Sequence, residues 1–158
     1  IEAATHARMV EALGLSSDQA VLDIGDPSGY SAAILSNIAS TVITLDQAKG
    51  YAAHAEALWN KIDANNIVAF EGGMQDGLEQ HAPYNAMLIN GAVGFVPQNL
   101  LNQLVDGGRL VAVLRSEPLS AGKAMLYIRS GDAFSERCLF DSAIPYLPGF
   151  EPKSDFKL

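Results

Sequence analysis

The sequence predicts a doubly wound α/β fold, in which helices cover a mostly parallel β-sheet. Short apolar runs alternate with segments of helical periodicity along most of the chain, as in successive β–α–β units. Two later apolar runs, 124–129 and 134–140, are joined by only four residues. A parallel crossover needs a dozen or more residues, so this pair must form an antiparallel hairpin. The expected sheet is therefore mostly parallel and ends in one reversed strand.

The order of the elements follows from the apolar periodicity and from the residues that interrupt it. Residues 1–13 keep one apolar face at helical spacing, and Gly14 ends that helix. Pro97 starts a later helix at a position where proline is tolerated, and a turn is expected at 106–108. The expected strands are 20–24, 41–45, 67–70, 86–89, 110–114, 124–129 and 134–140, and the expected helices are 1–13, 30–40, 48–62 and 97–104. The proline-rich tail, 145–158, is expected to lack regular structure.

The composition limits the class of protein. The 158 residues fit a single domain, 1–158, and a content of 49% hydrophobic and 18% charged residues indicates a globular, soluble chain. No apolar run reaches the roughly 20 residues of a membrane helix and no signal pattern is visible, so a cytoplasmic location without membrane contact is expected. The net charge of −8 argues against a nucleic-acid partner, because such binding needs clustered Lys and Arg.

The cysteine and the histidines do not form a metal-binding pattern. Cys138 is the only cysteine, which excludes an internal disulfide and a cysteine-based zinc site. Its apolar setting, RCLF, indicates a thiol buried in a strand. His6, His54 and His81 lack the spacing of metal ligands, so no metal site is expected.

The most informative segment is VLDIGDPSGY, residues 21–30. A strand enters a tight turn that holds Gly25 and Gly29, and a helix follows at once. Such a turn brings backbone N–H groups and a helix N-terminus close to a nucleotide-like ligand. Asp46 closes the next strand, TVITLD, where an acid can accept hydrogen bonds from both hydroxyls of a ribose. Asp23 and Asp46 each also have a structural interpretation, as a turn cap and as the end of a strand.

Four local sequences carry a resemblance to a known family. They are MVEALGL before the first strand, IGDPSGY in the turn, HAPYNAMLI at the fourth strand and LVDGGRLVAVL into the fifth. With these, the chain resembles protein-L-isoaspartate O-methyltransferases along most of its length, and its tail PYLPGFEP resembles a divergent branch. The resemblance implies a Rossmann-like, S-adenosylmethionine-dependent methyltransferase fold with a seven-stranded sheet. Members carry about fifty more N-terminal residues, so an N-terminal segment missing from this chain is expected.

The resemblance also implies an activity and roles for individual residues. S-adenosylmethionine is the implied cofactor, and the implied methyl acceptor is a carboxylate of a damaged protein or peptide, or a changed substrate. Asp23 stands near the methionine end of the cofactor, Asp46 at the ribose, and Asn90, followed by Gly91, beside the site of methyl transfer. The positions implied to bind the cofactor are Asp23, Gly25, Asp26, Ser28, Gly29, Asp46, Gly72, Gly73 and Asn90. No catalytic residue is assigned.

Three positions depart from the pattern of that family. Pro27 replaces the middle glycine of the turn, which removes conformational freedom and one N–H donor. Gly73 replaces the acid that would hold the adenine amino group, and Glu71 either substitutes for that acid or is a surface charge. Glu2 replaces the hydroxyl residue that faces the substrate carboxylate, and Thr5, one helical turn away, could supply a hydroxyl.

Three functions therefore compete. The first is an S-adenosylmethionine-dependent O-methyltransferase of the isoaspartyl-repair type. The second is a non-catalytic binding or assembly module that keeps the fold but has lost cofactor binding. The third, an NAD-dependent oxidoreductase, fits poorly because the turn lacks the G-x-G-x-x-G pattern. The sequence does not predict the oligomeric state.

Overall fold

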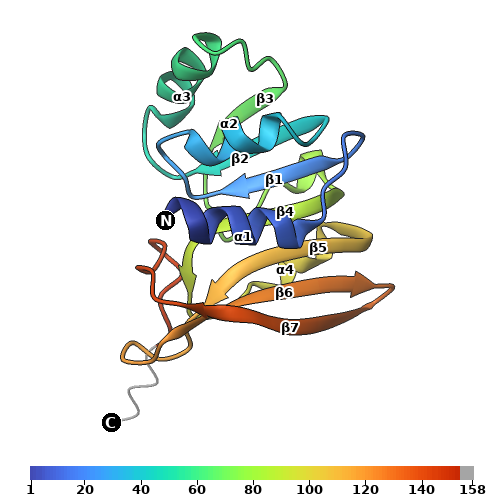
Figure 1. Cartoon of the computed structure of the whole chain (residues 1–158), viewed down its shortest axis with the longest axis vertical. Coiled ribbons are helices and arrows are strands. Elements are labelled where there is room, and N and C mark those ends of the chain that lie inside the picture. Colours follow the sequence, from blue (N-terminus) through green and yellow to red (C-terminus); the bar gives the residue numbers. More distant parts are fainter. Residues whose placement is uncertain (154–158) are drawn as a thin grey trace.

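The computed structural model describes residues 1–153 and contains a seven-stranded sheet (Figure 1). The strands are β1 (Ala20–Ile24), β2 (Thr41–Asp46), β3 (Ile67–Glu71), β4 (Tyr84–Val93), β5 (Leu104–Leu114), β6 (Gly122–Ser130) and β7 (Ala133–Ser142). Their order in the sheet is β3-β2-β1-β4-β5-β6-β7. Neighbours from β3 to β5 are parallel, whereas β6 is antiparallel to both β5 and β7. The mostly parallel sheet with a C-terminal hairpin is thus confirmed, and the reversed strand lies one place inside the edge.

Helices connect the strands at the expected places in the chain. They are α1 (Ala3–Leu13), α2 (Tyr30–Ser36), α3 (Tyr51–Asn60), the 3-10 helix η1 (Glu79–His81) and α4 (Gln98–Asn102). α1 ends where Gly14 adopts a left-handed φ of 58°. α3 begins later than expected because Gly50, with a φ of 81°, interrupts the helical backbone before it. No helix within residues 1–153 is long and apolar enough to cross a membrane.

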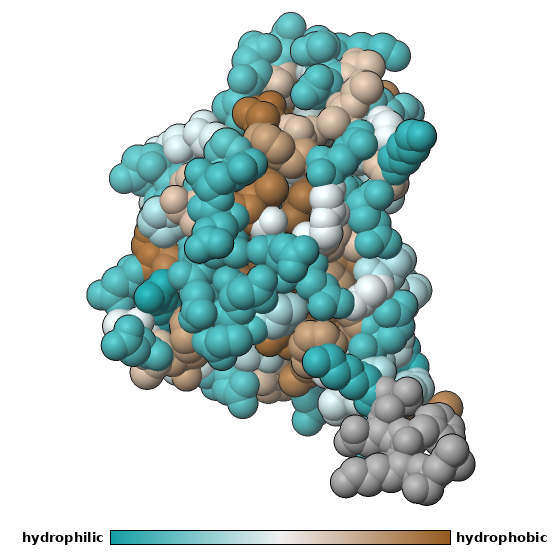
Figure 2. Space-filling view, turned by 180° about the vertical axis from the view of Figure 1, so that it is seen from behind, coloured by the Kyte–Doolittle hydropathy of each residue, from teal (hydrophilic) through white to brown (hydrophobic). Residues whose placement is uncertain are grey.

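Apolar side chains pack on both faces of the sheet, but the two faces are covered unequally. On one face, α1, α2 and α3 contribute Met9, Leu35 and Trp59 to the core. On the other face, α4 and the chain after β7 contribute Leu100 and Phe150. Viewed from behind, the molecule keeps apolar surface visible between hydrophilic side chains (Figure 2). The sheet therefore has a core on each face, as a doubly wound fold requires.

Two local predictions from the sequence are wrong. The expected turn at 106–108 lies inside β5, because β5 has extra residues between two successive pairing points with β4. These residues form a bulge, which Gly107 allows with a φ of 76°. Cys138 is exposed and not buried, because it lies on β7, the outermost strand of the sheet, most of whose residues face solvent.

The chain after β7 returns to the carboxyl end of β4. The Ala92 N–H donates to the Pro145 carbonyl at 2.9 Å, and the Ala92 carbonyl accepts the Leu147 N–H at 2.9 Å. One edge of β4 is paired with β5 along its length. The returning segment therefore lies along the opposite edge, which β1 occupies at residues 86–89. Fully buried Phe150 anchors its far end. We call residues 145–150 the strap, because they cross the sheet where β1 has ended.

The structure assigns no helix or strand to 145–153, apart from a single bridge between Tyr146 and Ala92. Residues 154–158 of the expected irregular tail lie outside the described residues.

Candidate functional site

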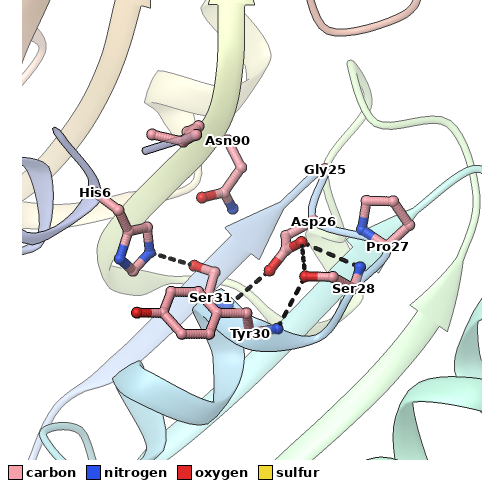
Figure 3. A pocket seen from close by; sticks show the side chains of 9 residues that line it. His6, Gly25, Asp26, Pro27, Ser28, Tyr30, Ser31 and Asn90 are labelled. Carbon is pink, nitrogen blue, oxygen red and sulfur yellow. Dashed lines mark hydrogen bonds between the residues drawn. The ribbon is translucent and has the colours of Figure 1, made fainter. Parts of the chain in front are cut away.

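The candidate site lies at the carboxyl ends of β1 and β4. The strand order reverses between these two strands, and ligands of doubly wound folds bind at such a point. Two cavities of about 370 Å³ and 490 Å³ open there, within the size range of small-molecule sites. We call the smaller one, shown in Figure 3, the helix-side cavity and the larger one the strap-side cavity. Both are lined by Gly25 and Pro27, so the turn after β1 joins them.

The turn after β1 accommodates its proline without strain. The Gly29 N–H donates to the Asp26 carbonyl at 3.2 Å, which makes 26–29 a β-turn with Pro27 in its second position. That position favours the fixed φ of proline and requires no N–H donor. Gly29 then adopts a φ of 76° and leads into α2. The departure at Pro27 therefore fits the local backbone.

The Asp26 carboxylate uses the donors of this turn. Its Oδ2 accepts the Ser31 N–H at 2.6 Å, and its Oδ1 accepts the Ser28 N–H at 3.1 Å. The Ser28 hydroxyl donates to Asp26 Oδ1 at 2.5 Å and accepts the Tyr30 N–H at 3.2 Å (Figure 3). Asp26 and Ser28 thus cap α2. The two side chains therefore already bond the N–H groups that the sequence predicts to face a ligand, while Asp26 and Ser28 themselves line the helix-side cavity as predicted.

A chain of buried polar side chains lies under the helix-side cavity. His6 Nε2 is 2.9 Å from Ser31 Oγ, and the Ser31 hydroxyl donates to Asp23 Oδ1 at 2.7 Å. Asn90 Nδ2 donates to the same carboxylate oxygen at 2.8 Å. His6, Ser31 and Asp23 are all buried, and His6, Ser31 and Asn90 also line the cavity. We call these four residues the His6–Asp23 chain.

Burial shifts the pKa of both titratable members of the His6–Asp23 chain. Desolvation raises the pKa of Asp23 to about 7, although the hydrogen bonds from Ser31 and Asn90 oppose the shift. The negative charge of Asp26 raises it further. Desolvation lowers the pKa of His6, against the opposing influence of Asp26. The His6 ring is therefore neutral at pH 7, where Asp23 is near its midpoint.

The strap-side cavity contains the second predicted acid. Asp46 lines it together with Met74, Leu147 and Pro148. Asp46 Oδ1 accepts the Ala48 N–H at 2.8 Å, whereas Oδ2 accepts no hydrogen bond from the residues that the structure describes. One oxygen is therefore held in place by the backbone and the other is left for a ligand, as a hydroxyl-binding acid requires.

The structure does not bring the predicted adenine segment into either cavity. Gly72 and Gly73 line neither of them, and Met74 is the residue of this loop that does. Glu71 Oε1 accepts the Ala52 N–H at 3.1 Å, at the start of α3. The Glu71 carboxylate thus binds a helix terminus instead of facing the site.

The N-terminal helix contributes a different side chain from the two that the sequence suggested. Glu2 and Thr5 line neither cavity, whereas His6 lines the helix-side cavity. His6 follows Thr5 directly, and one step along a helix turns a side chain by about 100°. Sequence reasoning also missed Ser31 and Leu147. The only sequence signal for Ser31 was that it and His6, polar residues on two predicted helices, could both face the acid Asp23 in the first strand.

Leu147 of the strap packs directly on the turn after β1. A Cβ added to Gly25 would lie 2.5 Å from Leu147 Cδ1 and 2.6 Å from Cδ2, so the Leu147 side chain would have to shift. Gly25 also has a φ of 81°, a region that L-residues avoid. Two separate constraints therefore require glycine at this position.

With this geometry in place, comparison with known proteins decides the family. The model of the family described as protein-L-isoaspartate(D-aspartate) O-methyltransferase matches residues 2–136. The chain belongs to this family. Its protein-L-isoaspartate O-methyltransferase relative from Azorhizobium caulinodans is 36% identical over 135 residues, which are 85% of this chain and 62% of that relative. Protein-L-isoaspartate O-methyltransferase 2 from Pelobacter propionicus is 45% identical over 105 residues, 66% of this chain and 47% of that relative. The chain thus spans about half to three fifths of their length.

Solved structures agree on the fold. A protein-L-isoaspartate O-methyltransferase superposes with a TM-score of 0.85 at 20% identity, over 94% of this chain and 48% of that one. A Plasmodium falciparum protein, described as a putative protein-L-isoaspartate O-methyltransferase in complex with S-adenosyl-L-homocysteine, has a TM-score of 0.68 at 18% identity. That match covers 90% of this chain and 72% of the other. The Rossmann-like methyltransferase fold expected from the sequence is confirmed.

Proposed function

We propose that this chain is an S-adenosylmethionine-dependent O-methyltransferase of the isoaspartyl-repair type, which methylates a carboxylate of damaged protein. The observation that carries the proposal is the pair of cavities joined at Gly25, with Asp46 on one side and the His6–Asp23 chain on the other. A nucleoside with an aliphatic substituent has two chemically different ends, and each cavity would take one of them. Membership of the family supports the activity, and the family match does not favour the non-catalytic alternative.

The charge of the turn favours a cationic nucleoside over a dinucleotide. A pyrophosphate needs free N–H groups at a helix N-terminus. At α2 those N–H groups are bonded to Asp26 and Ser28, and the Asp26 carboxylate would repel a phosphate. A positively charged sulfonium or ammonium group would be attracted instead, because Asp23 and Asp26 are both acids. This argues for S-adenosylmethionine and against the NAD-dependent oxidoreductase.

The residues of this chain would bind and orient the reactants. In the proposed arrangement, Asp46 would hold the ribose hydroxyls, with Met74 and Pro148 as the apolar wall of the strap-side cavity. Asp23 and Asn90 would face the methionine end. The bound cofactor supplies an already activated methyl group, so placing the acceptor oxygen in line can provide most of the rate. No acid–base residue is required for a carboxylate acceptor.

The test of this proposal is cofactor binding by calorimetry, with two matched acids. Asp46→Asn should raise the Kd for S-adenosylhomocysteine by about tenfold or more, because one hydrogen bond to a charged group is lost. Glu71→Gln is the control, because Glu71 pairs with Asp46 across the sheet but lines neither cavity. It should stay within about twofold of the unmodified chain. Equal effects of the two variants, or no binding at millimolar ligand, would refute the proposed site.

The acceptor is tested separately with a labelled methyl group. Transfer to a peptide containing isoaspartate should exceed transfer to the same peptide containing aspartate. Equal labelling of the two peptides, with cofactor binding intact, would refute the repair activity but keep the methyltransferase.

A further inference from the structure

Three members of the His6–Asp23 chain, each from a different element, meet at the hydroxyl of Ser31. His6 comes from α1, Asp23 from the end of β1 and Ser31 from α2. Ser31 Oγ lies 2.9 Å from His6 Nε2 and 2.7 Å from Asp23 Oδ1, and only 1% of its residue surface is exposed. Water therefore has little access to this hydroxyl. Because the hydroxyl has a single proton, one of its two neighbours must accept that proton and the other must donate to the hydroxyl oxygen.

Counting protons shows that a proton on Asp23 Oδ1 reverses the hydrogen bonds of this chain. When Asp23 is ionised, the Ser31 hydroxyl donates to Asp23, so His6 Nε2 must carry a proton and donate to Ser31. When Asp23 is protonated on Oδ1, the oxygen that faces Ser31, it can donate to Ser31, whose hydroxyl then donates to a bare Nε2. The neutral His6 ring must in that case carry its proton on Nδ1. A proton on Asp23 Oδ1 thus switches the tautomer of His6, whereas a proton on Oδ2 leaves it unchanged.

The second ring nitrogen of His6, Nδ1, is not buried. Nδ1 has no protein partner, and no buried side-chain nitrogen among the described residues lacks one, so Nδ1 is not buried. His6 also lines the helix-side cavity. The tautomer therefore decides whether the unburied ring nitrogen of His6 is a hydrogen-bond acceptor or a donor.

We propose that Ser31 is a positioning residue that transmits the protonation of Asp23 to His6, so that a cation bound beside Asp23 makes His6 Nδ1 an acceptor. The cation would be the ammonium or sulfonium group of the cofactor, and in this respect the inference rests on the proposed function. When such a cation enters, protonated Asp23 loses its proton to solvent and the hydrogen bonds of the chain reverse. Only protons move, and no bond between heavy atoms forms or breaks.

The charged groups around Asp23 are consistent with a single proton exchange. Asp26 in the turn disfavours ionisation, and Tyr51 on α3 stays protonated because burial raises its pKa. The neutral donors Ser31 and Asn90 favour ionisation. Around His6, desolvation lowers the pKa of the ring, whereas the carboxylate of Asp26 raises it. The pKa of about 7 for Asp23 places the reversal near neutral pH.

The first test needs no ligand. Nitrogen-15 NMR of the imidazole groups distinguishes the two neutral tautomers, and His6→Gln identifies the signals of His6 among the three histidines. Between pH 8 and pH 6, His6 should change from the Nε2–H to the Nδ1–H tautomer. Ser31→Ala should abolish this change, and Ser31→Thr, which keeps a hydroxyl, should restore it. Ser36→Ala is the matched control, because Ser36 lies on the same helix but bonds the Ala33 carbonyl.

The second test adds S-adenosylmethionine at pH 6, with binding followed independently by calorimetry. The ligand should return His6 to the Nε2–H tautomer in the unmodified chain and in Ser31→Thr, but not in Ser31→Ala. A tautomer that ignores pH in the unmodified chain, or follows pH equally in Ser31→Ala, would overturn the inference. Failure of the ligand to bind would count against the proposed function, whereas the ligand-free titration still tests the role of Ser31.

Discussion

Replacing Gly25 with alanine separates the two constraints on the turn after β1. A left-handed φ costs a non-glycine residue about 1–2 kcal/mol. The new Cβ would also lie 2.5 Å from Leu147 Cδ1, and overpacking of this kind costs about 1–3 kcal/mol. Gly25→Ala should therefore destabilise the fold by about 2–5 kcal/mol, which lowers the Tm by roughly 5–15 °C at this chain length.

The same substitution at Gly50 provides the control. Gly50 has the same φ of 81°, but a Cβ there would meet no atom within 4 Å. Gly50→Ala should thus cost only the backbone part, about 1–2 kcal/mol. The difference between the two glycines measures the contact with Leu147.

A double-mutant cycle measured by urea unfolding decides whether that contact is real. Leu147→Ala alone should cost about 2–5 kcal/mol, since the side chain is 6% exposed. In the Leu147→Ala background, Gly25→Ala should cost only about 1–2 kcal/mol, a coupling of about 1–3 kcal/mol. Gly50→Ala should cost the same in both backgrounds. If Gly25→Ala is equally costly with and without Leu147, the strap does not press on the turn and the reasoning is refuted.

Three further predictions follow from single residues. Asp23 has a folded-state pKa of about 7 against an ordinary 3.8, so the native state binds the extra proton, and stability should fall by up to about 3 kcal/mol between pH 5 and pH 8 in urea melts. Asp23→Asn should flatten that profile, and an unchanged slope would contradict the assignment. Pro27→Gly should lower stability by about 0.4–1 kcal/mol through the unfolded state while leaving the Kd for S-adenosylhomocysteine within about twofold, because the turn needs no donor there. A large gain in affinity would show that the proline obstructs the site. Cys138 should react with a thiol reagent without denaturant, because it is exposed, and protection until unfolding would contradict the placement of β7 at the edge.

Local patterns in the sequence were enough to predict most of the fold. β1 was predicted with its observed bounds, and the short connection before residue 133 required the hairpin that β6 and β7 form. The errors came from competition between local and distant partners. The segment 106–108 has turn residues, but its pairing with β4 absorbs it as a bulge. The burial of Cys138 depended on what covers β7, and its own neighbours in sequence do not report that.

The site could be predicted only where its chemistry is local. Asp46 and Gly25 line the cavities as the strand–turn pattern suggested. Asp26, predicted to face a ligand, lines the helix-side cavity, and its carboxylate also bonds the donors of its own turn, a common use of Asp before a helix. The contact between Leu147 and Gly25 brings together residues from opposite ends of the chain, and no spacing rule signals it.

The strap has a consequence for the life of the molecule in the cell. Residues 145–150 emerge from the ribosome long after the loop at 25–29, so translation delivers the two halves of one binding surface at different times. The early loop must wait, without its cover, until more than a hundred further residues have been made. A protease that cut between β7 and the strap would leave every strand of the sheet intact, and yet it would remove Leu147 and Pro148 from the wall of the strap-side cavity.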